Sequence, residues 1–308
     1  MLIKLYNMNK SLLLIIVAFI AINTNAQFKD PEQKIMNAEA RKGVEGSFIK
    51  LSDGITHYEK VGIAKNGVVI LVHGFSVPYY IWDGFFENLV NEGFQVIRYD
   101  LYGRGYSDRL NKEYTTTVYS QQIFDLIKGL SIKTPVYLMG VSFGGIVSAN
   151  FTLTYPALVK KLVLIDPAAG KTNITLTEQA LDEMMAINSE ERALSQLDDF
   201  KYPANFPNWV SRYKVQMQYK GTRKALVSTL FHYDTIPNLD RYKSLQNLQK
   251  STLLIWGTED HAVPYNYSDS IRSVLNVQFL SVSDAGHLPY LEKPTLVNKK
   301  VVSFLKEN

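Results

Sequence analysis

Residues 136–150 read VYLMGVSFGGIVSAN, which places Ser142 between Gly140 and Gly144, after an apolar run and before helix-forming residues. At ordinary frequencies of Gly and Ser, a Gly-x-Ser-x-Gly pentapeptide arises by chance in about one chain of this length in ten. The pentapeptide alone therefore leaves Ser142 with two interpretations, a nucleophile or a small residue in a glycine-rich turn. The segments around it decide between them.

The context of Ser142 is a strand, a sharp turn and a helix. This order predicts a strained turn that exposes the serine Oγ, in which Gly140 and Gly144 avoid side-chain collisions. The N-terminus of the helix that follows also favours developing negative charge. The context therefore favours Ser142 as a nucleophile.

Strand-like and helical patterns alternate along most of the chain. The strand-like segments are residues 47–51, 55–62, 67–74, 95–100, 135–141, 160–167, 251–257 and 277–283. The helical segments are residues 80–90, 118–130, 143–155, 265–275 and a last helix from about 294. The first two strands form a hairpin, because the intervening Ser-Asp-Gly suits a turn. Strands alternating with helices predict an α/β fold with a mostly parallel sheet flanked by helices.

One long segment breaks this alternation. Residues 168–250 carry helical patterns rich in aromatics and methionine and no convincing strand, which predicts a helical cap inserted after the sixth strand. The core then comprises residues 46–167 and 251–308. The aromatic and methionine side chains either line a substrate pocket or pack the cap onto the sheet: Phe200, Tyr202, Phe206, Trp209, Tyr213, Met217, Tyr219, Phe231 and Tyr233.

The N-terminus has the pattern of an export signal. Residues 1–26 contain two lysines, an apolar run at residues 12–22 and small residues before Gln27, which is typical of a cleaved signal peptide. Translation starts at Met1 or Met8. We expect a periplasmic or secreted protein with no stable anchor after cleavage, and an uncleaved membrane anchor is the alternative. Residues 27–45 are polar and are interpreted as a linker.

Composition limits the other possibilities. The chain of 308 residues is 46% hydrophobic, which allows a sizeable core. Its formal charge of +4 falls to +2 without the two lysines of the signal, and no basic run is present, so we expect no nucleic-acid partner. The absence of cysteine excludes disulfides, thiol catalysis, cysteine-ligated metals and a lipoprotein anchor.

A serine hydroxyl needs a base near neutral pH, and the chain offers five histidines. We predict that His287, in the loop after the last strand, is this base. His73 is interpreted as shaping a loop, and His57 as a surface or packing residue of the N-terminal hairpin. His232 lies in the helical insertion, and His261 directly follows a better acid candidate.

The base in turn needs an orienting carboxylate. Asp260, in WGTEDHAVP after the seventh strand, is the predicted acid, with Glu259 beside it exposed to solvent. Asp166, after the sixth strand, is the alternative. Asp284 is too close in sequence to His287 to reach its far ring nitrogen easily.

An oxyanion hole completes the expected site. The backbone N–H of Phe143, directly after the nucleophile, is one donor. The N–H of Phe75, in the loop HGFS, is the second. Both groups belong to the main chain, so the two side chains are free to line the pocket.

Five motifs in this order resemble the α/β-hydrolase superfamily: VHGFS, DLYGRGYSDR, GVSFGG, WGTEDHAVP and DAGHLPYLEKP. The resemblance covers residue 47 to the C-terminus and implies a triad of Ser142, Asp260 and His287 with residues 168–250 as the cap. It also implies that Asp100, Arg104 and Asp108 brace loops beside the site. The HGFS loop, with Trp82 downstream, looks like that of monoacylglycerol-lipase-type and carboxylesterase members, and the meta-cleavage carbon–carbon bond hydrolases share similar loops.

The expected activity is hydrolysis of a small-molecule carboxylic ester with an apolar acyl or aryl group, through an acyl-enzyme and without metal or cofactor. Amide, lactone or carbon–carbon bond hydrolysis by the same triad is a second interpretation. A non-catalytic binding protein on the same fold is a third, because a fold does not guarantee an activity. The sequence leaves the natural substrate and the oligomeric state open.

Overall fold

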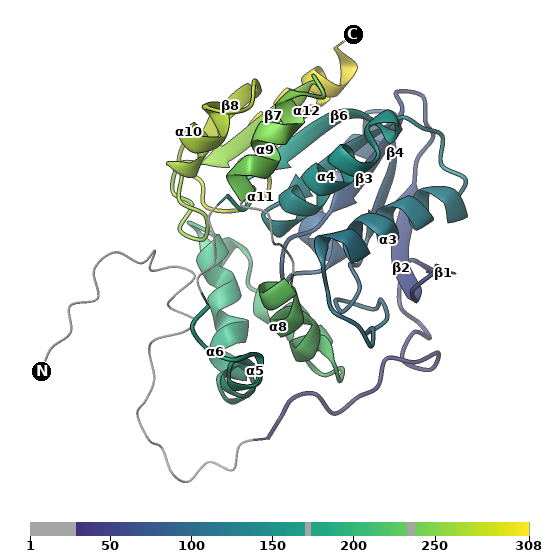
Figure 1. The fold of residues 1–308 in the computed structure, drawn as a ribbon, viewed down its shortest axis with the longest axis vertical. Coiled ribbons are helices and arrows are strands. Elements are labelled where there is room, and N and C mark those ends of the chain that lie inside the picture. The colour runs from purple at the N-terminus through teal and green to yellow at the C-terminus, as the bar shows by residue number, and fades with distance from the viewer. Residues whose placement is uncertain (1–28, 170–173, 233–237, 308) are drawn as a thin grey trace, which may run out of the picture.

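The computed structural model describes residues 29–169, 174–232 and 238–307. Its centre is a sheet of eight strands in the order β1-β2-β4-β3-β5-β6-β7-β8 (Figure 1). The strands are β1 Ser47–Lys50, β2 Ile55–Val61, β3 Val68–Val72, β4 Gln95–Tyr99, β5 Val136–Val141, β6 Val159–Ile165, β7 Thr252–Gly257 and β8 Gln278–Val282. β1 and β2 pair antiparallel, β2 pairs antiparallel with β4, and the remaining neighbours are parallel. The predicted fold class and all eight strands are confirmed.

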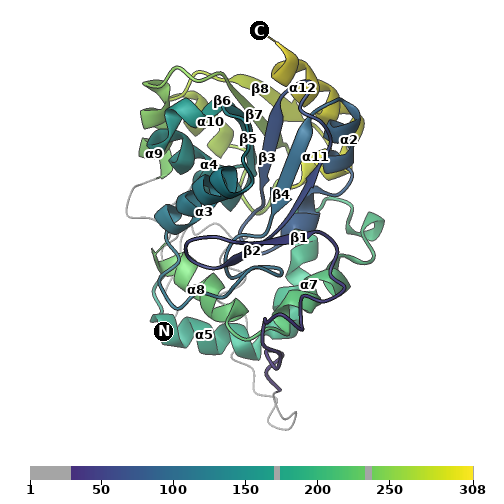
Figure 2. The same ribbon diagram turned by 90° about the vertical axis from the view of Figure 1, so that its right-hand side faces the viewer.

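Helices cover both faces of the sheet (Figure 2). One layer contains α3 Thr116–Gly129, α4 Phe143–Thr154, α9 Asn238–Gln246 and α10 Tyr267–Arg272, and the opposite layer contains α2 Phe85–Asn91, α11 Pro289–Glu292 and α12 Pro294–Lys306. Along β3, Val68, Ile70 and Val72 join the core under the first layer, whereas Val69 and Leu71 join the core under the second. Both faces of β3 are thus buried, which explains its uninterrupted apolar sequence.

The single helix predicted for residues 80–90 is two elements in the structure. A 3₁₀ turn, η1 Tyr79–Trp82, precedes α2, and Gly84 between them has φ 77°. Such a conformation suits glycine and interrupts a right-handed helix. The Glu87 side chain accepts a hydrogen bond from the Gly84 N–H, which starts α2 there.

The cap lies over one end of the sheet, where α5, α6 and α8 are visible in Figure 1. Its elements are α5 Glu178–Ile187, α6 Ser189–Leu194, η3 Ser195–Asp199, η4 Pro203–Asn205, α7 Trp209–Met217 and α8 Thr222–His232. α9 also falls within the range 168–250, but Tyr242 and Leu245 belong to the core over α4. The insertion therefore returns to the sheet layer before β7 begins.

The segment interpreted as a linker packs on the cap where α8 begins. The Glu32 carboxylate accepts hydrogen bonds from the N–H groups of Gly221 (2.8 Å) and Arg223 (2.5 Å). Asp30 forms an ion pair with Arg223, and the backbone of Lys34 pairs with residues 218 and 220. This described part of the segment is thus a strap across the α7–α8 turn.

The predicted signal peptide, residues 1–26, lies outside the described residues. Within the described ranges, no helix combines the length and the hydrophobicity that a bilayer-spanning helix requires.

Candidate active site

Ser142 occupies a tight turn between β5 and α4, with φ 54° and ψ −122°. This left-handed backbone conformation costs a non-glycine residue about 1–3 kcal/mol. A Cβ atom at Gly140 would overlap the carbonyl oxygen of Gly144, and one at Gly144 would overlap the carbonyl oxygen of Val72. The structure thus confirms that both glycines are needed for the strained turn that the sequence predicted.

Hydrogen bonds hold this turn against the neighbouring strands. The Ser142 N–H donates to the Ile165 carbonyl at 2.9 Å, and the Ser142 carbonyl accepts from Gly145 N–H (2.9 Å) and Ala168 N–H (3.1 Å). β6 and the loop after it therefore set the position of the serine.

His287 and Asp260 form a buried pair. Nδ1 of His287 donates to Oδ2 of Asp260 at 2.7 Å, and the two residues are only 4% and 5% exposed. Oδ1 of Asp260 accepts from the N–H groups of Ala262 and Val263, both at 2.8 Å. Backbone N–H groups thus orient one oxygen of the carboxylate, and the other oxygen orients the imidazole.

Burial and charge act in opposite directions on His287. Burial lowers its pKa, but the adjacent Asp260 carboxylate raises it more, so that the pKa reaches about 9. The site therefore favours the imidazolium form, which a base of this type must adopt during acyl transfer.

The topology brings these residues to one edge of the sheet. Ser142 follows β5, Asp260 follows β7 and His287 follows β8, and these strands run parallel. Loops at the carboxyl ends of parallel strands converge, so the three residues lie at the same edge of the sheet.

The structure pairs His287 with Asp260 and not with Asp166, the alternative acid. Asp166 follows β6 and is fully buried, and its Oδ1 accepts from the Gly257 N–H at 2.9 Å. Oxygen or nitrogen atoms of Asp166, Asp260 and His287 lie within 4.8 Å of one another. The hydrogen bonds in this cluster join His287 to Asp260 and backbone N–H groups to Asp260 and Asp166, so we assign the cluster to proton chemistry.

The loop expected to provide an oxyanion donor is rigidly held. The Phe75 carbonyl accepts from Nε of Arg104 at 2.9 Å, and Gly74 lies beside the Cβ of Ser142. The rings of Phe75 and Phe143 contact edge to face with centroids 6.2 Å apart. The two expected donor residues are therefore neighbours next to the serine.

His73 supports the same loop. Its Nε2 accepts from the Leu101 N–H at 2.9 Å and its Nδ1 donates to the Gly74 carbonyl at 2.8 Å. Burial lowers its pKa to about 4, so the ring is neutral at pH 7. His73 thus shapes the loop, as predicted.

Asp199, on η3 of the cap, is a charged neighbour that the sequence pattern did not reveal. Its backbone carbonyl accepts from the His287 N–H at 2.8 Å. Burial raises the pKa of the Asp199 carboxyl, which the charge of His287 partly offsets, to about 6. Asp199 lies far from the motifs in sequence, and only the folding of the cap places it near His287.

The cap adds an apolar wall next to Phe75. Leu181 and Met185 of α5 pack with Leu226 and Val227 of α8, and Phe75 contacts this cluster. Four of the nine cap residues singled out in the sequence have a different role. Phe200, Trp209, Tyr213 and Met217 belong to the core that contains β3 and β5, so they pack the cap onto the sheet.

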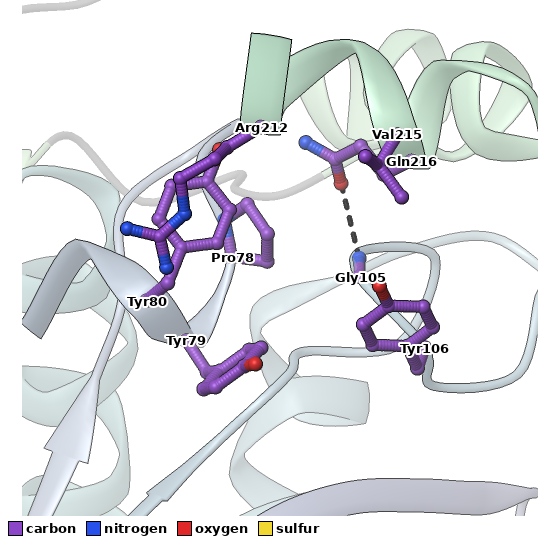
Figure 3. Close-up of a pocket in the computed structure, with 8 residues that line it drawn as sticks. All are labelled: Pro78, Tyr79, Tyr80, Gly105, Tyr106, Arg212, Val215 and Gln216. Atoms are coloured by element: carbon purple, nitrogen blue, oxygen red, sulfur yellow. Dashed lines mark hydrogen bonds between the residues drawn. The ribbon is translucent and has the colours of Figure 1, made fainter. Parts of the chain in front are cut away.

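A separate groove marks the outer seam between the cap and the sheet (Figure 3). It has a volume of about 110 Å³ and lies between the turns at Tyr79 and Tyr106 and the Arg212 side of α7. The Gly105 N–H donates to Gln216 across the seam at 3.0 Å. Ser142 and His287 do not line this groove, so we place the candidate site under the cap instead.

The family of the chain follows from comparison with known proteins. The family model of the alpha/beta hydrolase fold matches residues 67–294. The chain therefore belongs to this family and is a hydrolase of the α/β fold, which confirms the resemblance drawn from the five motifs.

Among individual proteins, the chain is similar to two bacterial lipases. Lipase 3 of Moraxella sp. (strain TA144) is 25% identical, and the match covers 89% of this chain and 86% of the lipase. Lipase 1 of Psychrobacter immobilis is 26% identical, with 87% and 86% covered. A thermophilic esterase from Thermogutta terrifontis has a similar fold, with a TM-score of 0.73, 22% identity and 85% and 98% covered.

Proposed function

We propose that this protein is an exported serine hydrolase that cleaves carboxylic esters with apolar acyl or aryl groups. The observation that carries the proposal is the buried His287–Asp260 pair at the sheet edge where the strained turn presents Ser142. Its similarity to two lipases supports ester substrates. The apolar wall of Leu181, Met185, Leu226 and Val227 supports an apolar substrate group.

In this proposal, His287 removes the proton of Ser142 and the serine oxygen attacks the ester carbonyl carbon. The N–H groups of Phe75 and Phe143 stabilise the negative oxygen of the tetrahedral intermediate. The intermediate collapses when the bond to the alkoxy oxygen breaks and His287 protonates the leaving alcohol. Water then hydrolyses the acyl-enzyme by the same route.

Asp260 stabilises the imidazolium that forms in both steps, and it keeps Nδ1 protonated so that Nε2 acts as the base. The raised pKa of His287 supports this role. Every catalytic group in the scheme comes from this chain, and the proposal includes no cofactor.

The first test is hydrolysis of p-nitrophenyl esters of short and medium acyl chains by purified residues 27–308. We expect turnover by the wild type and its loss in Ser142→Ala. The matched control is Ser148→Ala, which removes a buried hydroxyl from the same helix, α4. Absence of turnover in the wild type, or unchanged turnover in Ser142→Ala, would refute the proposal.

Two further measurements separate the remaining alternatives. A panel of esters, amides, lactones and carbon–carbon bond substrates ranks the activities by kcat/KM, and we expect esters to rank first. A fluorophosphonate probe labels an activated serine, so Ser142 should be labelled. A non-catalytic binding protein would leave Ser142 unmodified.

Export is tested separately. The proposed signal is residues 1–26, so the secreted or periplasmic fraction should contain a chain that begins at Gln27. A chain that keeps its N-terminus and sediments with membranes would support the uncleaved anchor instead.

A further inference from the structure

Asp166 is a buried carboxyl group that the proposed mechanism does not use. It is fully inaccessible to solvent, and one of its oxygen atoms lies within 4.8 Å of side-chain atoms of Asp260 and His287. Its Oδ1 accepts a hydrogen bond from Gly257. Its Oδ2 is buried and meets no hydrogen-bond donor among the described residues. A carboxylate oxygen in that position would carry negative charge with no compensation, which is costly.

This cost is avoided if Asp166 and the neighbouring Asp260 share one proton, which lies between the two carboxyl groups. Oδ1 of Asp260 accepts from two N–H groups and its Oδ2 accepts from His287, so three donors stabilise a negative charge on this carboxylate. Among the described residues, the Asp166 carboxyl group accepts from one donor, the Gly257 N–H. Two adjacent carboxyl groups do not both ionise, and the one with fewer donors keeps the proton.

From this geometry we propose that Asp166 is an uncharged carboxylic acid that donates a hydrogen bond to Asp260 and thereby positions the acid of the triad. It is a positioning residue, because it acts through Asp260. The proposal rests on the proposed function only for its effect on turnover. The protonation of Asp166 is a property of the fold.

The charges around Asp166 agree with this assignment. Burial raises its pKa well above the ordinary value, and the charge of Asp260 raises it further. Glu292 on α11 acts in the same direction, and only the Gly257 N–H opposes it. Tyr290 also faces Asp166, while Asp199 acts on His287 and Asp260 from the cap.

Infrared spectroscopy tests the proton directly, with no need for a substrate. At pH 8, wild-type protein labelled with ¹³C-aspartate should show a protonated carboxyl band that is missing in Asp166→Asn. Asp199, with a pKa of about 6, is ionised at this pH and does not contribute. No such band in the wild type, or an unchanged band in Asp166→Asn, would overturn the proposal even if the protein proves inactive on esters.

Stability provides a second readout. A folded-state pKa above that of the unfolded chain means that the unfolded state releases this proton first as the pH rises, so Asp166 destabilises the fold increasingly above about pH 4. Asp166→Asn removes this penalty and keeps a donor for Asp260. Its Tm should therefore rise relative to wild type between pH 4 and pH 8. A constant or falling difference in Tm would contradict the proposal.

Kinetics then measure the positioning role. Asp166→Asn should keep kcat within about threefold of wild type, whereas Asp166→Leu should lower kcat about 10- to 100-fold with little change in KM, since a charge-assisted hydrogen bond contributes about 1.5–3 kcal/mol. The acid limb of the pH profile, where kcat/KM rises with pH, should stay in place in Asp166→Asn, because an amide that replaces an uncharged acid removes no charge near His287.

Asp199→Asn is the matched control, because it removes an anion near His287 and should move the acid limb to lower pH. A similar downward movement in Asp166→Asn would show that Asp166 is an anion and overturn the proposal. Equal kcat in wild type and a folded Asp166→Leu would overturn the positioning role.

Discussion

The described residues contain two buried histidine–aspartate pairs, which differ in the contact that the second ring nitrogen makes. Nδ1 of His287 bonds to Asp260 at 2.7 Å, and Nδ1 of His57 bonds to Asp100 at 2.8 Å. Nε2 of His57 also bonds to an acceptor, the Glu45 carbonyl, at 2.8 Å. Both partners of His57 are acceptors, so both ring nitrogens are occupied and neither is free to act as a base.

The surroundings of Asp100 show that its pair has a structural role. The Asp100 carboxylate also accepts from the N–H groups of Tyr79 and Tyr106, so it ties β2 to two loops beside the cap. Burial lowers the pKa of His57, but the Asp100 charge raises it more. A histidine beside a carboxylate thus becomes a base only where its other nitrogen can exchange a proton with a reacting group.

The largest expected difference between the pairs is in activity. His287→Ala should lower kcat/KM on a p-nitrophenyl ester about 10⁴- to 10⁶-fold, because the base is lost. His57→Gln should keep the kcat/KM of folded protein close to wild type. It should lower the free energy of unfolding by about 3–5 kcal/mol, because it leaves part of a buried charge unpaired. Kinetics and urea unfolding of both variants measure this, and a large activity loss in His57→Gln would contradict the comparison.

The two acids should differ in the same way, with a smaller effect. Asp260→Asn should lower kcat by about 10⁴-fold, since an amide favours the wrong tautomer of His287. Asp100→Asn should act on stability and leave kcat nearly unchanged. The comparison fails if the two substitutions reduce kcat equally in protein that is fully folded.

The pH dependence sharpens the contrast. His287 must be neutral to act as base, so kcat/KM should rise with pH through its pKa of about 9 and level off above it. Because this folded-state pKa is raised, the pair stabilises the fold fully below the unfolded pKa of about 6.5 and loses this contribution as the pH approaches 9. A pH–rate profile should move to lower pH in Asp260→Asn and stay in place in His57→Gln. If the rising part of the profile moved in both variants, it would report the titration of a group other than His287.

The smallest expected effect concerns the N-terminal strap. A chain that begins at residue 46 lacks the Glu45 carbonyl on His57 and the Glu32 contacts with α8. Its Tm should fall by a few degrees, corresponding to about 1–2 kcal/mol. The rate on short p-nitrophenyl esters should change little, and a complete loss of turnover would show that the strap supports the site itself.

Most of the sheet and the local chemistry of the elbow follow from sequence patterns. Apolar runs identify the strands, and Gly140 and Gly144 identify the turn at Ser142, because these signals are local. The helix predicted for residues 80–90 was divided by Gly84, whose left-handed conformation depends on its neighbours. Residues 27–45 carried no regular pattern, and their contacts with α8 are between distant segments.

The sequence by itself determined the fold class, the elbow around Ser142 and the candidates His287 and Asp260, because periodicity, glycine placement and the ends of strands are written in short segments. Only the tertiary structure decided that His287 bonds to Asp260 and not to Asp166, that Asp199 approaches from the cap, and that His57 is fully enclosed. These outcomes depend on burial and on distances between residues far apart in the chain. Both quantities arise only when the sheet, the cap and the strap pack together.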